Sequence, residues 1–295
     1  MLRKLQEIPE ARLLDGSDNE SRIALVNMKQ FAVIASLDLE GSDHVLDVAS
    51  KIAGTVDGIK IGIPTILESG TVILGEIRKL LEDKPLLVDL KIADIGFRSK
   101  QTWQGTNSKI LSKLAGSGAS HVTVHGFPGP SSVAEAVSAG KDVGIGILLL
   151  PMMSHVGADS FFSGQMNISK FEESCEKSGV KLNTSSKLSL KDVTDGVLAL
   201  GEAVGVDGYI GPATNPQDLL RYRIFTKKPI WCPGFGRQDR LGRTLAEQFG
   251  DWAATVGPQS AAIVGSLIYN APDPCAAANM VIQTRDSVIS ELQPN

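Results

Sequence analysis

Three ionisable residues lie within six positions of an otherwise apolar stretch, VDLKIADIG at 88–96. Asp89 and Lys91 are two residues apart, so on a strand both side chains point to the same face, and Asp94 follows just past the strand. Burying charge without a partner costs several kcal/mol. Two interpretations are open: the three residues pair to hold the fold together, or they lie at the mouth of a site and do chemistry.

Short apolar runs alternate with longer amphipathic stretches along most of the chain. The predicted strands are 31–37, 56–63, 85–91, 120–126, 143–150, 206–211, 229–234 and 261–265. Helix-like segments include 43–54, 65–82, 99–116, 129–139, 215–223 and 272–291. Strands that are apolar on both faces and alternate with helices indicate a parallel sheet covered by helices. Eight such units predict a single (β/α)8 TIM barrel. An open doubly wound sheet is the rival, but no strand is followed by a GxGxxG motif that opens a helix.

The barrel is predicted to span residues 29–295, preceded by a short helical extension over 1–28. Residues 151–190 are longer than a usual connection and are rich in Ser, Lys and Glu. They predict a long insertion after strand 5 that forms either a lid with short helices or a mobile segment.

Two further charged residues lie at the ends of predicted strands: Asp38 ends the first strand, and Lys60 lies near the end of the second. The carboxyl ends of barrel strands carry the active site in enzymes of this fold. Together with the 88–96 stretch, three carboxylates and two ammonium groups are expected at one mouth. A ring of structural salt bridges is the alternative, but five buried charges add desolvation cost without adding apolar packing.

A metal site is a second alternative, because three aspartates could supply the oxygen ligands that Mg²⁺ prefers. Two lysines argue against it, since each ammonium would compete with the ion for the same carboxylates. The histidines show no ligand spacing, and His125 is expected to be a hydrogen-bonded loop residue. We therefore expect no metal.

The segments PGFGRQ (233–238) and IVGSLIY (263–269) follow the seventh and eighth strands. In (β/α)8 barrels these two loops often bind phosphate through backbone N–H groups and a helix N-terminus. Gly234, Gly236 and Gly265 would let the backbone approach an anion closely. Alone, such glycine turns are weak evidence, but their position in the barrel favours an anion site.

The bulk composition excludes several classes of protein. The net charge of −4 and the pI of about 5.6 come without a basic stretch, which argues against nucleic acid as a partner. Three widely separated cysteines without CxxC spacing fit reduced thiols in the cytoplasm. The N-terminus has no apolar signal region and no run approaches 18 apolar residues, so neither a signal peptide nor a membrane span is expected.

The motif D-x-K-x-x-D at 89–94 resembles the signature of the orotidine 5′-phosphate decarboxylase suprafamily. ASLDLE and IKIGIP resemble its first-strand Asp and second-strand Lys segments. VHGFPGPSSV, MSHVGAD, YIGPATNP and PGFGRQ resemble later segments, of archaeal-type members especially. The resemblance covers roughly 31–290, apart from 163–200.

The resemblance implies decarboxylation of orotidine 5′-phosphate to UMP without a cofactor, in pyrimidine biosynthesis. It implies that Lys91 protonates C6 of the pyrimidine, that Asp89 lies against the substrate carboxylate, and that Lys60 and Asp38 hold the ribose and the charge network. It also implies a homodimer in which Asp94 comes from the neighbouring subunit. The substrate-binding residues that it implies are Ile95, Ser154, Pro233, Gly234, Phe235, Gly236, Arg237, Gln238, Gly265 and Ser266.

Two positions depart from the family pattern. The family usually reads V-G-R-S-I-Y after the eighth strand, whereas this chain has Ser266 in place of the phosphate-clamping arginine. The family also commonly has threonine where this chain has Arg98. A bidentate guanidinium contact to phosphate is strong and a serine cannot replace it. Arg237, in the preceding loop, could restore the positive charge.

Two other functions therefore stay open. One is a sugar-phosphate decarboxylase or aldolase resembling the hexulose-phosphate synthase branch, which would require Mg²⁺. The other is a paralogue that keeps the fold and the charge network but has lost or altered phosphate recognition, as Ser266 suggests.

Overall fold

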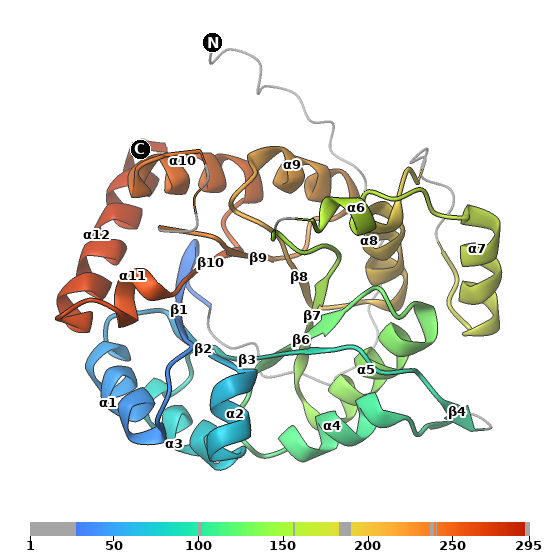
Figure 1. Ribbon diagram of the computed structural model, residues 1–295, viewed down its shortest axis with the longest axis horizontal. Helices are drawn as coiled ribbons and strands as arrows, with labels where there is room; N and C mark the ends of the chain where they lie inside the picture. The colour runs from blue at the N-terminus through green and yellow to red at the C-terminus, as the bar shows by residue number, and fades with distance from the viewer. Residues whose placement is uncertain are drawn as a thin grey trace, which may run out of the picture.

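Eight parallel strands close into a barrel surrounded by helices in the computed structural model (Figure 1). The structure describes residues 28–99, 102–155, 157–182, 190–236, 239 and 241–292. The barrel strands are β1 (Ala32–Leu37), β2 (Gly58–Gly62), β3 (Leu86–Ile92), β6 (His121–His125), β7 (Gly146–Leu150), β8 (Gly208–Ile210), β9 (Ile230–Pro233) and β10 (Ala261–Val264). The predicted (β/α)8 barrel is confirmed.

Most helices are placed between successive barrel strands, as the alternation of apolar runs predicts. They are α1 (Ser42–Ile52), α2 (Ile63–Ser69), α3 (Val72–Leu81), α4 (Thr106–Leu114), α5 (Pro130–Val143), α6 (Asp159–Phe162), α7 (Ile168–Lys177), α8 (Val193–Val204), α9 (Pro216–Phe225), α10 (Leu245–Val256), α11 (Ser266–Tyr269) and α12 (Pro274–Leu292). None of the helices in the described ranges is both long and apolar enough to cross a membrane.

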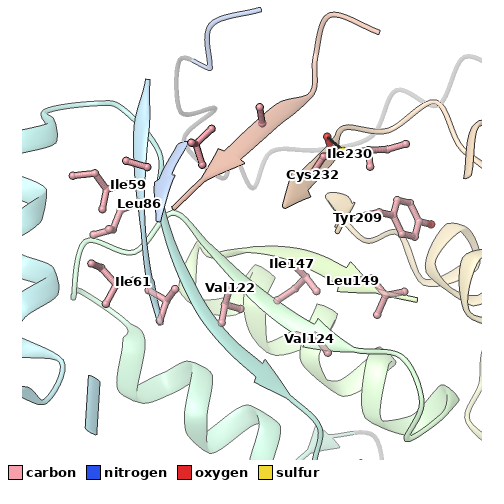
Figure 2. Close-up of a cluster of buried hydrophobic side chains, with 14 of the residues drawn as sticks. Ile59, Ile61, Leu86, Val122, Val124, Ile147, Leu149, Tyr209, Ile230 and Cys232 are labelled. Atoms are coloured by element: carbon pink, nitrogen blue, oxygen red, sulfur yellow. Dashed lines mark hydrogen bonds between the residues drawn. The ribbon is translucent and has the colours of Figure 1, made fainter. Parts of the chain in front are cut away.

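Side chains alternate along the strands between two apolar layers. In β1, Ala32 and Ile34 face the barrel interior, whereas Val33 and Ala35 belong to the layer between strands and helices. Figure 2 shows that outer layer, with Ile61, Val122 and Leu149 among its buried side chains. Because both faces are buried, the strands are apolar throughout, which explains the continuous apolar runs of the sequence.

Two predicted helices are wrong in part. The segment 65–82 contains two helices, α2 and α3, because Gly70 ends α2 with a φ of +65°. In the segment 99–116, the first residues instead form an antiparallel pair, β4 (Arg98–Ser99) with β5 (Thr102–Trp103). Helix α4 begins only after Gly105, whose extended backbone forms the N-cap.

The connection after β7 contains two short helices, α6 and α7, as predicted for the 151–190 insertion. The predicted helical extension over 1–28 lies outside the described residues except for Met28, whose side chain packs on the cluster inside the barrel. The division into an extension and a barrel at residue 28 stays a prediction.

Candidate functional site

A cavity of about 270 Å³ opens at the carboxyl ends of the barrel strands. Four of the five charged residues predicted for this mouth line it: Asp38, Lys60, Asp89 and Lys91. Its other lining residues are Ser36, Leu87, Thr123, Leu150, Met152, Met153, Ser154, His155, Ile210, Pro212, Pro233, Phe235, Ile263, Gly265, Ser266 and Tyr269. One side of the cavity is therefore charged, and the side formed by β8–β10 is mainly apolar.

Asp89 lies between the two lysines. Its Oδ2 accepts hydrogen bonds from Nζ of Lys91 at 2.8 Å and from Nζ of Lys60 at 3.2 Å. Its Oδ1 accepts from the hydroxyl of Thr123 at 2.7 Å. The Asp89 side chain is 14% exposed, so both of its oxygens are satisfied by protein groups away from bulk water.

Opposite influences act on the pKa of Asp89. Burial favours the neutral acid and would raise the pKa. The charges of Lys60 and Lys91, with hydrogen bonds from Lys91 and Thr123, outweigh burial and bring the pKa below its ordinary value. Asp89 is therefore a carboxylate at neutral pH.

Lys91 has a strained backbone. Its φ is +47°, in the left-handed region that non-glycine residues rarely adopt, and the β3–β6 register shifts between Val88 and Ile92. The N–H of Lys91 donates to Oγ1 of Thr123 at 2.8 Å. Strain of this kind costs about 1–3 kcal/mol and is concentrated at functional sites. Here the bulge directs the ammonium group of Lys91 into the cavity.

Asp38 continues the charged row away from Lys91. Its two oxygens lie 3.2 and 3.3 Å from Nζ of Lys60, and the hydroxyl of Ser36 donates to Oδ2 at 2.7 Å. Two carboxylates thus alternate with two ammonium groups in the order Asp38, Lys60, Asp89, Lys91, and the four charges sum to zero.

Asp94 does not line the cavity of its own chain. It follows β3 on an exposed loop, and its Oδ1 accepts the N–H of Ile95 at 2.7 Å. Ile95 is 74% exposed and also lies outside the lining. The expectation that all five charges converge at one mouth within a single chain is therefore wrong for Asp94.

Five residues predicted to bind substrate line the cavity: Ser154, Pro233, Phe235, Gly265 and Ser266. The β8–β10 side presents no lysine or arginine among its described lining residues. The predicted ligands Arg237 and Gln238 lie outside the described residues.

Gly234 and Gly236 shape the loop after β9 without lining the cavity. Gly234 has a φ of +117°, and a Cβ there would lie 2.7 Å from Cγ2 of Thr214. The N–H of Gly236, one of the amides expected to reach an anion, donates to Oε1 of Gln248 at 2.8 Å. That amide is therefore already satisfied within the protein.

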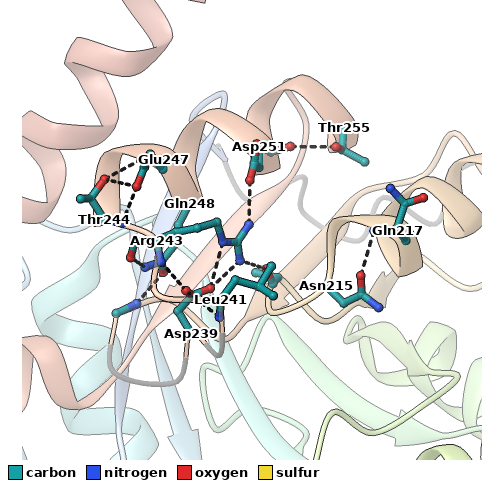
Figure 3. A network of polar contacts seen from close by, with 12 residues as sticks. Asn215, Gln217, Asp239, Leu241, Arg243, Thr244, Glu247, Gln248, Asp251 and Thr255 are labelled. Atoms are coloured by element: carbon teal, nitrogen blue, oxygen red, sulfur yellow. Dashed lines mark hydrogen bonds and ion pairs between the residues drawn. The ribbon is translucent and has the colours of Figure 1, made fainter.

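The loop after β9 ends in a polar network around Arg243 (Figure 3). The guanidinium donates to Oδ1 of Asp239 at 2.6 and 3.0 Å, to Asp251 at 2.8 Å and to the carbonyl of Ala213 at 3.1 Å. A capping box of Thr244 and Glu247 then begins α10. Arg243 is held by these partners, so it anchors the loop and is not a cation directed at the cavity.

His125 departs from its expected environment. It is the last residue of β6 and is buried, and among the described residues its Nδ1 finds no hydrogen-bond partner. Its ring stacks on Phe162 of α6, with centroids 5.6 Å apart. Burial, with a smaller effect of Lys91, lowers its pKa to about 4. His125 is therefore neutral at pH 7 and connects β6 to the insertion.

Sequence reasoning missed Thr123 and Ser36, which bond to the two carboxylates. Ser36 lies two residues before Asp38, and Thr123 lies two residues before His125. A hydroxyl in an otherwise apolar strand is the signal that could have identified each of them. Tyr269, Met152 and Met153 were also missed, because apolar side chains in connections carry no comparable signal.

The fold and the cavity define a (β/α)8-barrel protein whose site is at the carboxyl ends of the strands, with a lysine–aspartate row inside it. The model of the Orotidine 5′-phosphate decarboxylase / HUMPS family matches residues 32–281, and the chain belongs to this family.

The chain matches curated relatives over most of its own length and nearly all of theirs. The chain is 26% identical over 255 residues to orotidine 5′-phosphate decarboxylase of Methanococcoides burtonii, covering 86% of this chain and 96% of that protein. It is 29% identical over 254 residues to the protein of that name from Methanosphaera stadtmanae, with 85% and 96% covered.

Solved structures agree with the barrel. Orotidine 5′-phosphate decarboxylase from Pyrococcus horikoshii is similar with a TM-score of 0.62 at 26% identity, covering 86% of this chain and 99% of that one. The Methanocaldococcus jannaschii enzyme in complex with the inhibitor BMP has a TM-score of 0.66 at 24% identity, with 87% and 99% covered, which supports the fold.

Proposed function

We propose that this protein decarboxylates orotidine 5′-phosphate to UMP without a cofactor. The observation that carries the proposal is the position of Lys91, whose ammonium group is held 2.8 Å from Asp89 inside the cavity by a strained backbone. Family membership and the names of the relatives support orotidine 5′-phosphate as the substrate. The protein is then a carboxy-lyase of pyrimidine biosynthesis.

The reaction breaks the bond between C6 and the carboxylate, and CO₂ leaves without the electron pair. The pair remains at C6 as a carbanion, which no cofactor delocalises. Lys91 supplies a fixed positive charge beside C6 and then donates the Nζ proton that makes UMP. Asp89, beside the substrate carboxylate, disfavours the bound ground state more than the transition state.

Lys60 and Asp38 keep these groups in place and contact the ribose. Lys60 bonds to both carboxylates, so a shift of either Asp38 or Asp89 would move it. The row costs little reorganisation during the reaction because its hydrogen bonds exist before substrate binds. Preorganised charge is the reason for having ionised groups at this depth in the barrel.

We also propose that the active form is a homodimer, in which Asp94 completes the site of the partner subunit. Asp94 is exposed and outside its own cavity. The apolar side chains beside it, Ile95 and Phe97, are 74% and 54% exposed. A second copy of the chain that received Asp94 would also cover these two apolar side chains.

A second candidate function is binding without decarboxylation, in a paralogue with altered phosphate recognition. Ser266 replaces the expected arginine, and the N–H of Gly236 already bonds to Gln248.

The sugar-phosphate branch of the family differs from the decarboxylase in requiring Mg²⁺. Incubating the purified protein with orotidine 5′-phosphate and, separately, with a hexulose phosphate, each with and without EDTA, and following consumption of the substrate discriminates all three functions. Metal-independent turnover supports the decarboxylase, EDTA-sensitive turnover of a sugar phosphate supports the other branch, and no turnover supports the paralogue.

A further inference from the structure

The loop that carries Asp94 is attached to α4 and α5 by buried polar groups. The hydroxyl of Ser132 donates to the carbonyl of Asp94 at 2.5 Å, and Nδ2 of Asn107 donates to the same carbonyl at 3.1 Å. The N–H of Asp94 donates to Oδ1 of Asn107 at 3.3 Å. Asn107 and Ser132 are fully buried, so solvent does not compete for these bonds.

Glu135 holds the next part of the same loop. Its side chain lies on α5 and is 0% exposed, and its two oxygens accept backbone N–H groups from two segments. Oε2 accepts from Phe97 at 2.8 Å, three residues after Asp94, and Oε1 accepts from Ser108 at 2.9 Å in the first turn of α4. One carboxylate therefore ties the Asp94 loop to the start of α4.

Two glycines allow the loop to approach α5 this closely. A Cβ at Gly96 would lie 2.1 Å from the carbonyl oxygen of Ser131, and one at Gly105 would lie 2.3 Å from Oε2 of Glu135. Backbone in such contact has little freedom to shift. A fully buried carboxylate costs several kcal/mol unless its hydrogen bonds are complete, so this arrangement specifies the loop geometry closely.

We infer that Glu135, together with Ser132, is a positioning residue that acts across the subunit interface: it fixes the loop from which Asp94 reaches the partner's site. This inference rests on the proposed function, because it requires Asp94 to act in the partner. It predicts that Glu135 matters for the Lys91 of the other chain and not for the Lys91 of its own chain.

Glu135→Gln keeps the shape of the side chain but replaces one acceptor oxygen by a donor that faces an N–H group. We expect kcat of the homodimer to fall about 10- to 100-fold, because displacement by about 1 Å is enough to lower a rate 100-fold. Ser132→Ala, which removes one bond to Asp94, is the gentler second variant, and a smaller fall in kcat is expected.

Mixed dimers with two affinity tags separate action on the partner from action within the chain. A Lys91→Ala chain paired with a Glu135→Gln chain has one Lys91, and the Asp94 that serves it comes from the chain with intact Glu135. This heterodimer should turn over at half the wild-type rate per dimer. A chain with both substitutions paired with a wild-type chain should be as slow per site as the Glu135→Gln homodimer.

The control is Asp207→Asn, since Asp207 accepts the N–H of Ile147 at 2.7 Å near the amino ends of the strands. Its homodimer should lose stability with kcat unchanged. Slow turnover of the Lys91→Ala/Glu135→Gln heterodimer would overturn the inference and leave the proposed function intact, provided that the Lys91→Ala/Asp94→Ala heterodimer recovers activity. If that second heterodimer also stays inactive while the wild type turns over orotidine 5′-phosphate, Asp94 does not act in the partner, and the inference fails while the decarboxylase function stands. If the wild type itself does not turn over orotidine 5′-phosphate, the proposed function fails and the inference with it.

Discussion

The N–H of Lys91 donates to Oγ1 of Thr123 over 2.8 Å, and the same hydroxyl donates to Oδ1 of Asp89 over 2.7 Å. Thr123 thus connects the backbone of the proposed proton donor to the carboxylate that fixes its ammonium group. The three residues come from β3 and β6, adjacent strands of the barrel. A displacement of any one of them moves the other two.

Thr123→Val should weaken this connection while preserving side-chain shape. It leaves the N–H of Lys91 and one oxygen of Asp89 without a partner, and we expect kcat to fall about tenfold with a stability loss of about 1–3 kcal/mol. Steady-state kinetics and urea unfolding provide the two measurements.

Thr226→Val is the matched control, because Oγ1 of Thr226 also donates to a carboxylate, Glu202, and accepts a backbone N–H, that of Lys228. It should lose stability with kcat unchanged. Equal kinetic effects in the two variants would show that Thr123 has no special role in the site.

The left-handed backbone of Lys91 gives a prediction about stability alone. Lys91→Gly should have a free energy of unfolding about 1 kcal/mol higher than Lys91→Ala, because glycine adopts a positive φ without strain. Denaturant unfolding of the two variants measures the difference. Glu82, exposed with a φ of +54°, should show the same order between its glycine and alanine variants. If alanine is the more stable replacement at position 91, the backbone there is unstrained.

Two histidines of β6, one buried and one half-buried, determine the direction in which stability changes with pH. Burial lowers the pKa of His121 and of His125 to about 4, from an ordinary value of 6.5. Between pH 6.5 and 4 the unfolded chain therefore binds protons that the folded chain does not, and the free energy of unfolding falls as the pH falls. The slope is about 1.4 kcal/mol per pH unit for each histidine.

His125→Phe should flatten this slope by the contribution of one histidine while keeping the ring stacked on Phe162. Chemical unfolding at pH values between 4 and 7 measures the slope. His44→Phe, at an exposed position, should leave it unchanged. A slope that does not respond to His125→Phe would show that this imidazole titrates normally.

Phosphate recognition is tested at Ser266, which stands where the family has an arginine, and at Arg237, which could replace that arginine. If Arg237 replaces the missing arginine, Arg237→Ala should raise KM strongly and lower kcat, because contacts to the phosphate also drive closure of the site. Ser266→Arg should then change KM and kcat little, because Arg237 already neutralises the phosphate. A feeble wild type that Ser266→Arg rescues, together with undetectable binding of UMP by calorimetry, would instead support the paralogue.

The barrel could be predicted from the sequence because its strands are apolar on both faces and alternate with helices. The 99–116 segment could not, because local periodicity does not reveal the antiparallel β4–β5 pair or the bond from Phe97, just before β4, to Glu135 on α5. Asp38, Lys60, Asp89 and Lys91 were identified because charge at a strand end is conspicuous. The hydroxyl of Thr123 in an apolar strand was a signal, but its bond to the Lys91 backbone depends on the bulge in β3, which leaves no clear mark in the sequence.

The most direct test of the account is the loss of orotidine 5′-phosphate absorbance with wild-type protein and with Lys91→Ala, both in EDTA. We predict rapid conversion to UMP by the wild type, and a rate at least about 10³-fold lower for the variant, whose circular dichroism spectrum should match that of the wild type. Lys79→Ala, at an exposed position on α3, should be fully active. A folded Lys91→Ala protein that converts the substrate at the wild-type rate would contradict the central claim.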